Sequence, residues 1–366
     1  MVSLLFKAGG LLLLLAGSLS GLETRTLSTA PDMLAARAGH TATPLTDGRV
    51  LFTGGCVVTG CEGGLTESAE LFNPERNSFE NTSGLALARV GHRAVRLATG
   101  KVLILGGWAG DAVTATAESY DPATERFEVI GGMLEPRDGF TATRLHNGQI
   151  LITGGYSGNM NRLSSAELYD PETERFLALA PMREARMSHT ATLLADGRVL
   201  IVGGSNARGQ VSDTAELFDP VTQQFSLVGK LTLPRHKHAA VALKNGDVLI
   251  VGGAGAGDWD EQYSSTELYD PKAQTFRAAA SMTQERFKLP DAIALLPSGA
   301  VLVAGGGKQA EVYQPATDTF SPVSGDLGLD LAYTTVVTLQ DERLLIAGGY
   351  DTGIRVVKNA WFYTTH

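Results

Sequence analysis

Residues 189–225 read HTATLLADGRVLIVGGSNARGQVSDTAELFDPVTQQF, and this stretch decides the fold. It divides into four strand-like pieces separated by turn residues. The first two, residues 189–194 and 199–202, flank Asp196-Gly197, where glycine supplies the positive φ of a tight hairpin turn. After a variable loop, residues 215–218 form the third piece, and Phe225 anchors the fourth beyond an Asp-Pro turn. The stretch therefore predicts a four-stranded antiparallel meander.

The same pattern recurs along nearly the whole chain. A Gly-Gly pair ends an apolar run in each of seven units, at intervals of 43 to 53 residues. The pairs begin at Gly54, Gly106, Gly154, Gly203, Gly252, Gly305 and Gly348. A period of about 50 residues is the length of one propeller blade, which buries its faces against its neighbours. We predict an all-β fold, a seven-bladed β-propeller.

Further landmarks keep the same frame in six of the units. Each third strand contains a glutamate, an aromatic residue and then a proline follow, and a phenylalanine comes five residues after the proline. The glutamates are Glu70, Glu118, Glu167, Glu216, Glu267 and Glu311. A coincidence of this detail indicates that the units share one structure.

The seventh unit predicts how the ring closes. It has a third strand at residues 360–363 and no fourth strand before His366. Residues 23–27 align in frame with the fourth strands of the other units. We predict that this N-terminal strand completes the last blade, so that no sheet edge at the seam stays unpaired.

The first 21 residues have the layout of a secretory signal peptide. Lys7 precedes an apolar stretch over residues 8–17, and small residues follow up to Ser20. The apolar run is short for a membrane span, and a retained anchor is the alternative. We expect residues 22–366 to form a single exported propeller, periplasmic or secreted, with no membrane span after cleavage.

The chain contains two cysteines, Cys56 and Cys61. In an oxidising compartment this pair is expected to close a small loop as a disulfide. A metal site is the alternative, but it would need further soft ligands, and the adjacent Glu62 offers one carboxylate. We therefore predict a disulfide, no metal and no cofactor.

The formal net charge of −9 bears on the partners. An acidic surface repels phosphate backbones and anionic lipid, and no run of lysine and arginine offsets it. Nucleic acid is therefore not an expected partner. We expect a monomer that binds a glycan or a protein.

The motifs Gly-Arg-Val-Leu followed by Gly-Gly, and Ala-Glu-Leu-Tyr-Asp-Pro, resemble those of the kelch-repeat family, especially bacterial secreted members. The resemblance covers residues 22–363. The resemblance is highly specific for the propeller fold but says little about function, because kelch propellers bind proteins, bind sugars and sometimes catalyse reactions.

Two more positions recur at fixed distances before each Gly-Gly pair. Seventeen residues before it stand Arg37, Arg89, Arg137, Arg186, Arg235, Lys288 and Leu331. Fourteen residues before it stand His40, His92, Phe140, His189, His238, Asp291 and Thr334. The seventh unit loses both the base and the glutamate, which indicates a structural ion pair in each of the other blades. We interpret the histidines as packing and hydrogen-bonding groups rather than ligands of a shared metal.

Variation in loop length predicts the binding face. The loops between second and third strands vary most, and function on repeat folds gathers where loops vary. Aromatic residues beside carboxylates and amides in these loops suit sugar faces and hydroxyls, or a peptide. The candidate ligand-binding residues are Trp108, Asp111, Tyr156, Asn159, Arg162, Arg208, Asp258, Trp259, Asp260, Tyr263, Tyr350 and Asp351.

Catalysis is the alternative to a binding module. No nucleophile elbow, zinc motif or phosphate loop is present, so no catalytic residue is named. The repeat is similar to the propeller of secreted copper-radical oxidases such as galactose oxidase, which implies a cysteine cross-linked to a tyrosine, with tyrosine and histidine ligands on the channel strands. The inner strand of the first blade has no cysteine, and that of the last blade has Tyr333 without an adjacent histidine. The chain also resembles signal-bearing sialic-acid mutarotases, whose anomer interconversion needs only placed acid and base groups. We favour a binding module over a sugar isomerase, and the isomerase over a carbohydrate oxidase.

Overall fold

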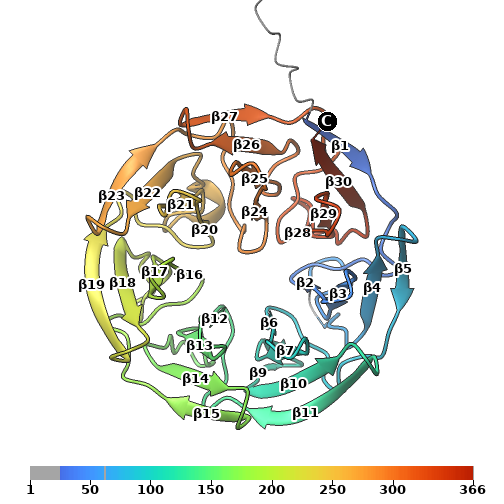
Figure 1. Ribbon diagram of the computed structural model, residues 1–366, viewed down its shortest axis with the longest axis horizontal. Helices are drawn as coiled ribbons and strands as arrows, with labels where there is room; N and C mark the ends of the chain where they lie inside the picture. Colours follow the sequence, from blue (N-terminus) through green and yellow to red (C-terminus); the bar gives the residue numbers. More distant parts are fainter. Residues whose placement is uncertain (1–24, 62, 366) are drawn as a thin grey trace, which may run out of the picture.

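The computed structural model describes residues 25–61 and 63–365 of the chain. Seven four-stranded antiparallel sheets stand around a central channel, as Figure 1 shows, so the predicted seven-bladed propeller is confirmed. The predicted signal peptide lies outside the described residues. Within them, no helix is long and apolar enough to cross a membrane.

The blades follow one another around the ring in chain order. Blade 1 contains β2 (Thr41–Pro44), β3 (Val50–Thr53), β4 (Ala69–Asn73) and β5 (Ser78–Asn81). Blade 2 contains β6 (Arg93–Arg96), β7 (Val102–Leu105), β10 (Thr116–Asp121) and β11 (Arg126–Gly132), with the small pair β8 (Trp108–Ala109) and β9 (Ala112–Val113) in its loop. Blade 3 contains β12 (Thr141–Arg144), β13 (Ile150–Thr153), β14 (Ala166–Asp170) and β15 (Arg175–Ala178). Blade 4 contains β16 (Thr190–Leu193), β17 (Val199–Val202), β18 (Thr214–Asp219) and β19 (Gln224–Lys230).

The remaining blades have the same order. Blade 5 contains β20 (Ala239–Ala242), β21 (Val248–Val251), β22 (Thr266–Asp270) and β23 (Thr275–Ala279), and its loop holds the 3-10 helix η1 (Asp258–Asp260). Blade 6 contains β24 (Ile293–Leu295), β25 (Val301–Val303), β26 (Glu311–Gln314) and β27 (Thr319–Pro322). Blade 7 contains β28 (Thr335–Thr338), β29 (Leu344–Ala347), β30 (Ala360–Thr365) and β1 (Arg25–Thr29).

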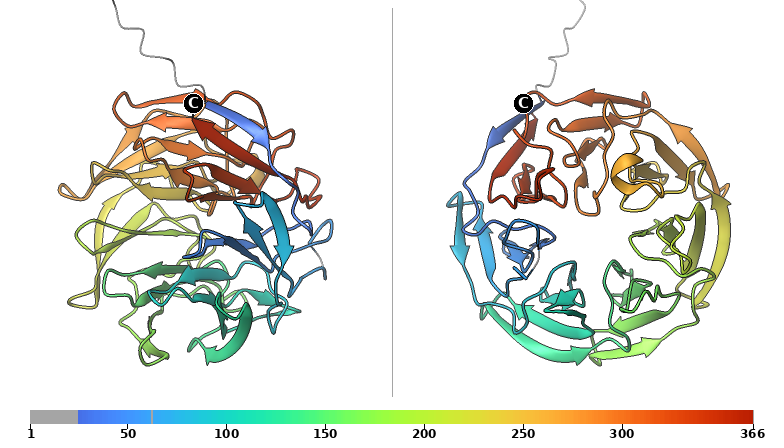
Figure 2. Two further views of the ribbon diagram at one scale, coloured as in Figure 1. Left: turned by 45° about the vertical axis from the view of Figure 1, so that its right-hand side comes forward. Right: turned by 180° about the vertical axis from the view of Figure 1, so that it is seen from behind.

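The N-terminal strand closes the ring as predicted. β1 pairs antiparallel with β30, with Leu27 opposite Tyr363. The two strands lie side by side in Figure 1 and again in the view from behind in Figure 2. The described strand covers Arg25–Thr29, so it runs two residues beyond the predicted end, and Glu23 lies outside the described residues.

The core lies between blades rather than at the centre of the ring. Successive residues of a second strand point to opposite faces of its sheet. In β17, Ile201 packs in a cluster with Leu151 of blade 3, whereas Leu200 packs with Ile250 of blade 5. Because both faces are covered, these second strands are apolar throughout and fully buried.

In each of six blades, a buried arginine–glutamate ion pair joins the segment before the first strand to the third strand. The nitrogen–oxygen distances are 2.7 to 3.0 Å, and the side chains are almost fully buried. The pairs are Arg37–Glu70, Arg89–Glu118, Arg137–Glu167, Arg186–Glu216, Arg235–Glu267 and Arg286–Glu311. The predicted structural pairing is therefore confirmed.

The predicted base of blade 6 was wrong. Arg286, not Lys288, pairs with Glu311, because it lies 19 residues before Gly305 rather than the 17 residues found in blade 1. Two extra residues precede the first strand of this blade. They also move the histidine-equivalent position from Asp291 to Leu289, whose side chain lies over Gly252 as His238 lies over Gly203.

The predicted disulfide between Cys56 and Cys61 is present, and no described cysteine is free. Cys56 is buried, and backbone hydrogen bonds bridge it to Ala38. The disulfide therefore ties the tip of the first variable loop to the inner wall of its blade.

Candidate functional site

A cavity of about 350 Å³ lies at the mouth of the central channel. All seven blades contribute to its wall, and it opens on the side where the loops between second and third strands begin. Its volume is within the range of small-molecule sites. Its functional groups include the aromatic rings of Trp108, Tyr333 and Tyr350 and the charged groups of Arg93 and Asp138.

The inner rim of the cavity is built from one equivalent position in each blade. This position lies two residues after the buried arginine, or after Leu331 in blade 7, just before the first strand. Its φ is between 52° and 68° in all seven blades. The rim residues are Gly39, Gly91, Gly139, Ser188, Lys237, Lys288 and Tyr333. All of them except Lys288 line the cavity.

Backbone hydrogen bonds link rim residues of neighbouring blades. Ser188 N–H donates to Gly139 O at 2.7 Å, and Lys237 N–H donates to Ser188 O at 2.9 Å. Gly91 and Tyr333 donate in the same way to the rim residue of the preceding blade. Four of the seven neighbouring pairs of rim residues are therefore joined by a direct backbone hydrogen bond.

Four histidines lie one residue beyond the rim and are buried. The Nε2 atom of His189 lies 3.0 Å from Thr153 Oγ1 and 3.2 Å from Thr141 Oγ1 of the preceding blade. His40, His92 and His238 contact threonines of their neighbouring blades in the same way. The interpretation of these histidines as hydrogen-bonding groups is confirmed, and the structure shows that their partners belong to the neighbouring blade.

Burial keeps these histidines neutral. It lowers the pKa of His189 to about 3, with a further contribution from the charge of Arg186. It lowers the pKa of His40 to about 3 in the same way, with Arg37 as the second cause. The pKa values of His92 and His238 are also well below the usual value, because of burial and a neighbouring arginine.

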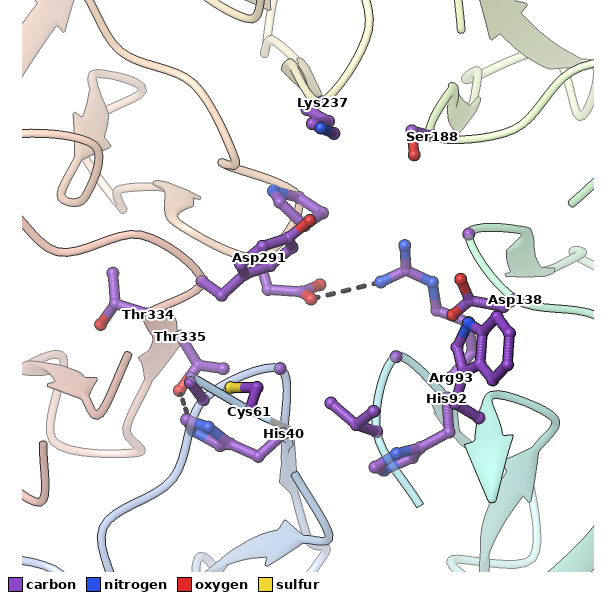
Figure 3. Close-up of a pocket in the computed structure, with 18 of the residues that line it drawn as sticks. His40, Cys61, His92, Arg93, Asp138, Ser188, Lys237, Asp291, Thr334 and Thr335 are labelled. Atoms are coloured by element: carbon purple, nitrogen blue, oxygen red, sulfur yellow. Dashed lines mark hydrogen bonds and ion pairs between the residues drawn. The ribbon is translucent and has the colours of Figure 1, made fainter. Parts of the chain in front are cut away.

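An ion pair crosses the cavity from blade 2 to blade 6. Arg93 Nη1 lies 3.3 Å from Asp291 Oδ2, and Arg93 Nε donates to Phe140 O at 2.9 Å. Asp291 belongs to the segment lengthened by two residues in blade 6, which reaches toward the channel in Figure 1. Figure 3 shows this pair between Lys237 and Ser188 on one side and His40 and His92 on the other.

Asp138 is the carboxyl group of the wall that can exchange a proton near neutral pH. Burial raises its pKa to about 6, although the Trp108 indole N–H and the charge of Arg93 act in the opposite direction. A group with such a pKa can act as a general acid or base at neutral pH.

Lys288 occupies an aromatic enclosure beside the cavity. Its Nζ lies 4.0 Å from the ring centroid of Trp259 and 5.2 Å from that of Tyr350, and it donates to Tyr350 Oη at 2.7 Å. Burial lowers the pKa of Lys288 to about 8, with the charge of Lys237 as the second cause. The neighbouring rim lysine, Lys237, pairs with Asp258 at 2.8 Å.

The structure brings four of the predicted binding residues together. Trp108 and Tyr350 line the cavity, and Trp259 and Asp258 contact the two rim lysines behind it. Tyr156 does not line it but stacks on Trp108 with ring centroids 6.1 Å apart.

The other predicted residues do not line the cavity. Asp111, Asn159, Arg208 and Asp260 are exposed farther along their loops, and Arg162 is half-buried. Tyr263 packs against Arg235 and hydrogen-bonds Glu261, whereas Asp351 pairs with Arg355. These contacts lie within single blades.

Sequence reasoning missed most of the polar residues of the cavity wall. Arg93, Asp138, Ser188 and Lys237 line the cavity but were not candidates, and Tyr333 was considered only as an oxidase ligand. A signal was present: the position two residues after each buried arginine, or after Leu331 in blade 7, changes from glycine to serine, lysine or tyrosine within an otherwise regular motif.

Among solved structures, the fold is similar to "Novel fungal alcohol oxidase with catalytic diversity among the AA5 family, in complex with copper". The TM-score is 0.71 at 16% sequence identity, and the match covers 94% of this chain and 76% of that chain. At this identity the similarity shows the fold alone.

The donor groups here do not fit a copper-radical centre. Such a centre needs a cysteine cross-linked to tyrosine, but Cys56 and Cys61 are bonded to each other. The cavity histidines use Nε2 to contact threonines. In the described part of the chain, no group of three or more His, Cys, Asp or Glu side chains could hold a metal ion.

No curated protein matches the chain in sequence. The family model described as "KLHDC2/KLHL20/DRC7 Kelch-repeats domain" matches residues 91–306, which is more than half of the 366 residues. The repeat landmarks and the seven four-stranded blades agree with that match. The chain therefore belongs to the kelch-repeat family of β-propellers.

Proposed function

We propose that the protein binds a small carbohydrate in the cavity at the channel mouth. The kelch propeller is a fold that commonly serves as a binding module, and its site decides what is bound. The observation that carries the proposal is one wall that combines aromatic rings with paired charged groups in about 350 Å³.

The residues of the wall suit a neutral polyhydroxy ligand. Aromatic rings such as Trp108 and Tyr333 offer apolar faces for the C–H face of a sugar ring, with polar groups at their edges. The charges are balanced, because Arg93 pairs with Asp291 and Lys237 pairs with Asp258. Paired charges donate and accept hydrogen bonds without favouring an ion of one sign.

Export is part of the same proposal. The layout of residues 1–21 predicts it, and a disulfide such as Cys56–Cys61 persists in an oxidising compartment. A periplasmic or secreted propeller would meet environmental glycans there. The location would be checked by fractionating cells that express the full chain.

The binding proposal is tested on an array of defined mono- to hexasaccharides. We expect Trp108→Ala to lose at least tenfold in affinity for the glycans that the wild type binds, since a stacking contact of about 1.4 kcal/mol corresponds to that factor. Val221→Ala is the control, because Val221 is 90% exposed in the turn between β18 and β19. Two results together would contradict glycan binding: the wild type gives no signal on the array, and it captures a protein that Trp108→Ala does not capture. The ligand of the cavity would then be a protein partner.

Asp138 supports a second candidate function, the interconversion of sugar anomers. Ring opening needs a proton donor and acceptor, and the pKa of Asp138 near 6 meets this requirement in the cavity wall. We expect the wild type, but not Asp138→Asn, to accelerate anomer exchange of N-acetylneuraminic acid or D-galactose in saturation-transfer NMR. Equal exchange rates with and without the wild type would leave binding as the function.

A further inference from the structure

We propose that the cavity has two unlike sides: Ser188, Lys237 and Tyr333 recognise the hydroxyl groups of the sugar, whereas Gly39, Gly91 and Gly139 leave the wall to side chains of the following blades, against which the sugar ring lies. The inference rests on the proposed function, since it assigns roles within the same cavity. It makes the rim position of each blade the determinant of specificity.

The rim positions are structurally equivalent, so their side chains can be compared directly. All seven have φ between 52° and 68°, and backbone hydrogen bonds connect several of them around the channel. Blades 1 to 3 carry glycine at this position, whereas blades 4 to 7 carry serine, two lysines and tyrosine. The change from no side chain to polar side chains therefore divides the ring into two arcs.

The glycine arc has no room for side chains. A Cβ atom at Gly39 would lie 2.7 Å from Val90 Cγ2, and one at Gly91 would lie 2.4 Å from Asp138 Oδ1. At Gly139 the nearest atom, Met187 Cε, would be 3.3 Å away. These glycines therefore leave their place in the wall to Val90, Asp138 and Met187 of the following blades, which line the cavity.

The side-chain arc offers polar groups that are free or readily exchanged. No described group hydrogen-bonds the hydroxyl of Ser188 or that of Tyr333, although both residues line the cavity. Lys237 pairs with Asp258, but the two side chains are 20% and 36% exposed, so water or a ligand hydroxyl can compete. Hydroxyls without partners beside an ammonium group match the donors and acceptors of a sugar.

Positive φ alone does not identify these residues. Asn77, Glu125, Glu174, Gln223, Gln274 and Asp318 have φ from 49° to 56° in the turns between third and fourth strands. Those turns lie at the other end of the blades and are not part of the cavity. The side chains of Ser188, Lys237 and Tyr333 line the cavity, which distinguishes them from the turn residues, and Figure 3 shows Ser188 directed into it.

The turns supply a matched control. Gln223→Gly removes a side chain at φ 56°, as Ser188→Gly does at φ 55° and Lys237→Gly at φ 53°. The three variants therefore relieve the same backbone conformation, and only two of them change the cavity. Tyr333→Phe removes the second hydroxyl of the set while keeping the ring.

The experiment measures array affinities and melting temperatures of these four variants with the same set of mono- to hexasaccharides. We expect Ser188→Gly, Lys237→Gly and Tyr333→Phe each to lose about tenfold in affinity, with Gln223→Gly unchanged. The melting temperature of Ser188→Gly should shift as that of Gln223→Gly does, which excludes unfolding as the cause.

Two results overturn the inference in distinguishable ways. Rim variants that bind within twofold of Gln223→Gly, while Trp108→Ala has lost binding, refute the assigned roles and leave the proposed function intact. A wild type that binds no glycan on the array refutes the proposed function and the inference with it.

Discussion

Each buried arginine satisfies several groups at once. Arg186 donates to Gly203 O at 2.8 Å and to Thr214 O at 3.0 Å, in addition to its ion pair with Glu216. Glu216 in turn accepts from the backbone N–H groups of Arg183 and Glu184. A buried charge is tolerated only when its partners are in place, so the pair fixes the link between blades to the third strand.

Blade 7 shows that the pair can be replaced. Leu331 stands at the arginine position and Trp361, opposite Ile346, stands at the glutamate position, and both belong to one apolar cluster. Replacing both charges by apolar groups avoids the desolvation penalty that a single replacement leaves behind.

We therefore expect non-additive losses in blade 4. Arg186→Leu should lower the free energy of unfolding by about 3–5 kcal/mol, because it leaves Glu216 charged and buried without its partner. Arg186→Leu combined with Glu216→Leu should lose less than the sum of the two single variants. Urea unfolding of the four proteins measures this, and strictly additive losses would contradict it.

At the scale of elements, the sequence predicted strands better than side-chain positions. The strands follow from residues repeated in every unit, such as Gly203 and Glu216, so seven copies correct one another. The register failed where one copy differs: counting 17 residues back from Gly305 reached Lys288 instead of Arg286. The two additional residues carry Asp291 into the cavity, so the same irregularity is part of the site.

The loops explain which predicted site residues lie at or beside the cavity. Trp108, Tyr156 and Tyr350 directly follow a Gly-Gly pair, and each is bridged to the inner link of its blade, at Val90, Asp138 and Ala332. Their places are therefore set by the repeat. Residues farther along a loop, such as Asn159, depend on a path that no repeat defines, and sequence alone could not place them.

At the scale of the whole molecule, the ring depends on contacts between blades. The hydrophobic clusters each combine strands of two consecutive blades, including blades 7 and 1 across the seam. The histidine–threonine contacts form a second set of joints, since His189 of blade 4 reaches Thr141 and Thr153 of blade 3. Four such histidine–threonine joints repeat around the channel, so protonation of the histidines would act on the ring at several places.

Acid should weaken these joints together. The pKa of His189 is about 3 in the folded protein and 6.5 ordinarily, so between these values the unfolded chain binds more protons. Stability is therefore complete above pH 6.5 and falls as the pH decreases toward 3. His189 and His40 each contribute a slope of about 1.4 kcal/mol per pH unit, or about 2 kcal/mol between pH 7 and 5.

A protonated His189 would also place a second N–H where no acceptor exists, since its Nδ1 is buried without a partner among the described residues. Phe140 occupies the equivalent position of blade 3, so His189→Phe is a replacement that the fold already uses. Losing the threonine contacts lowers the free energy of unfolding by the same amount at pH 7 and at pH 5. Losing the titrating imidazole changes only the difference between the free energies of unfolding at the two pH values. Urea unfolding at both pH values should therefore show that His189→Phe loses about 2 kcal/mol less on acidification than the wild type does. An identical loss in the two proteins would mean that His189 is not part of the acid-sensitive set of joints.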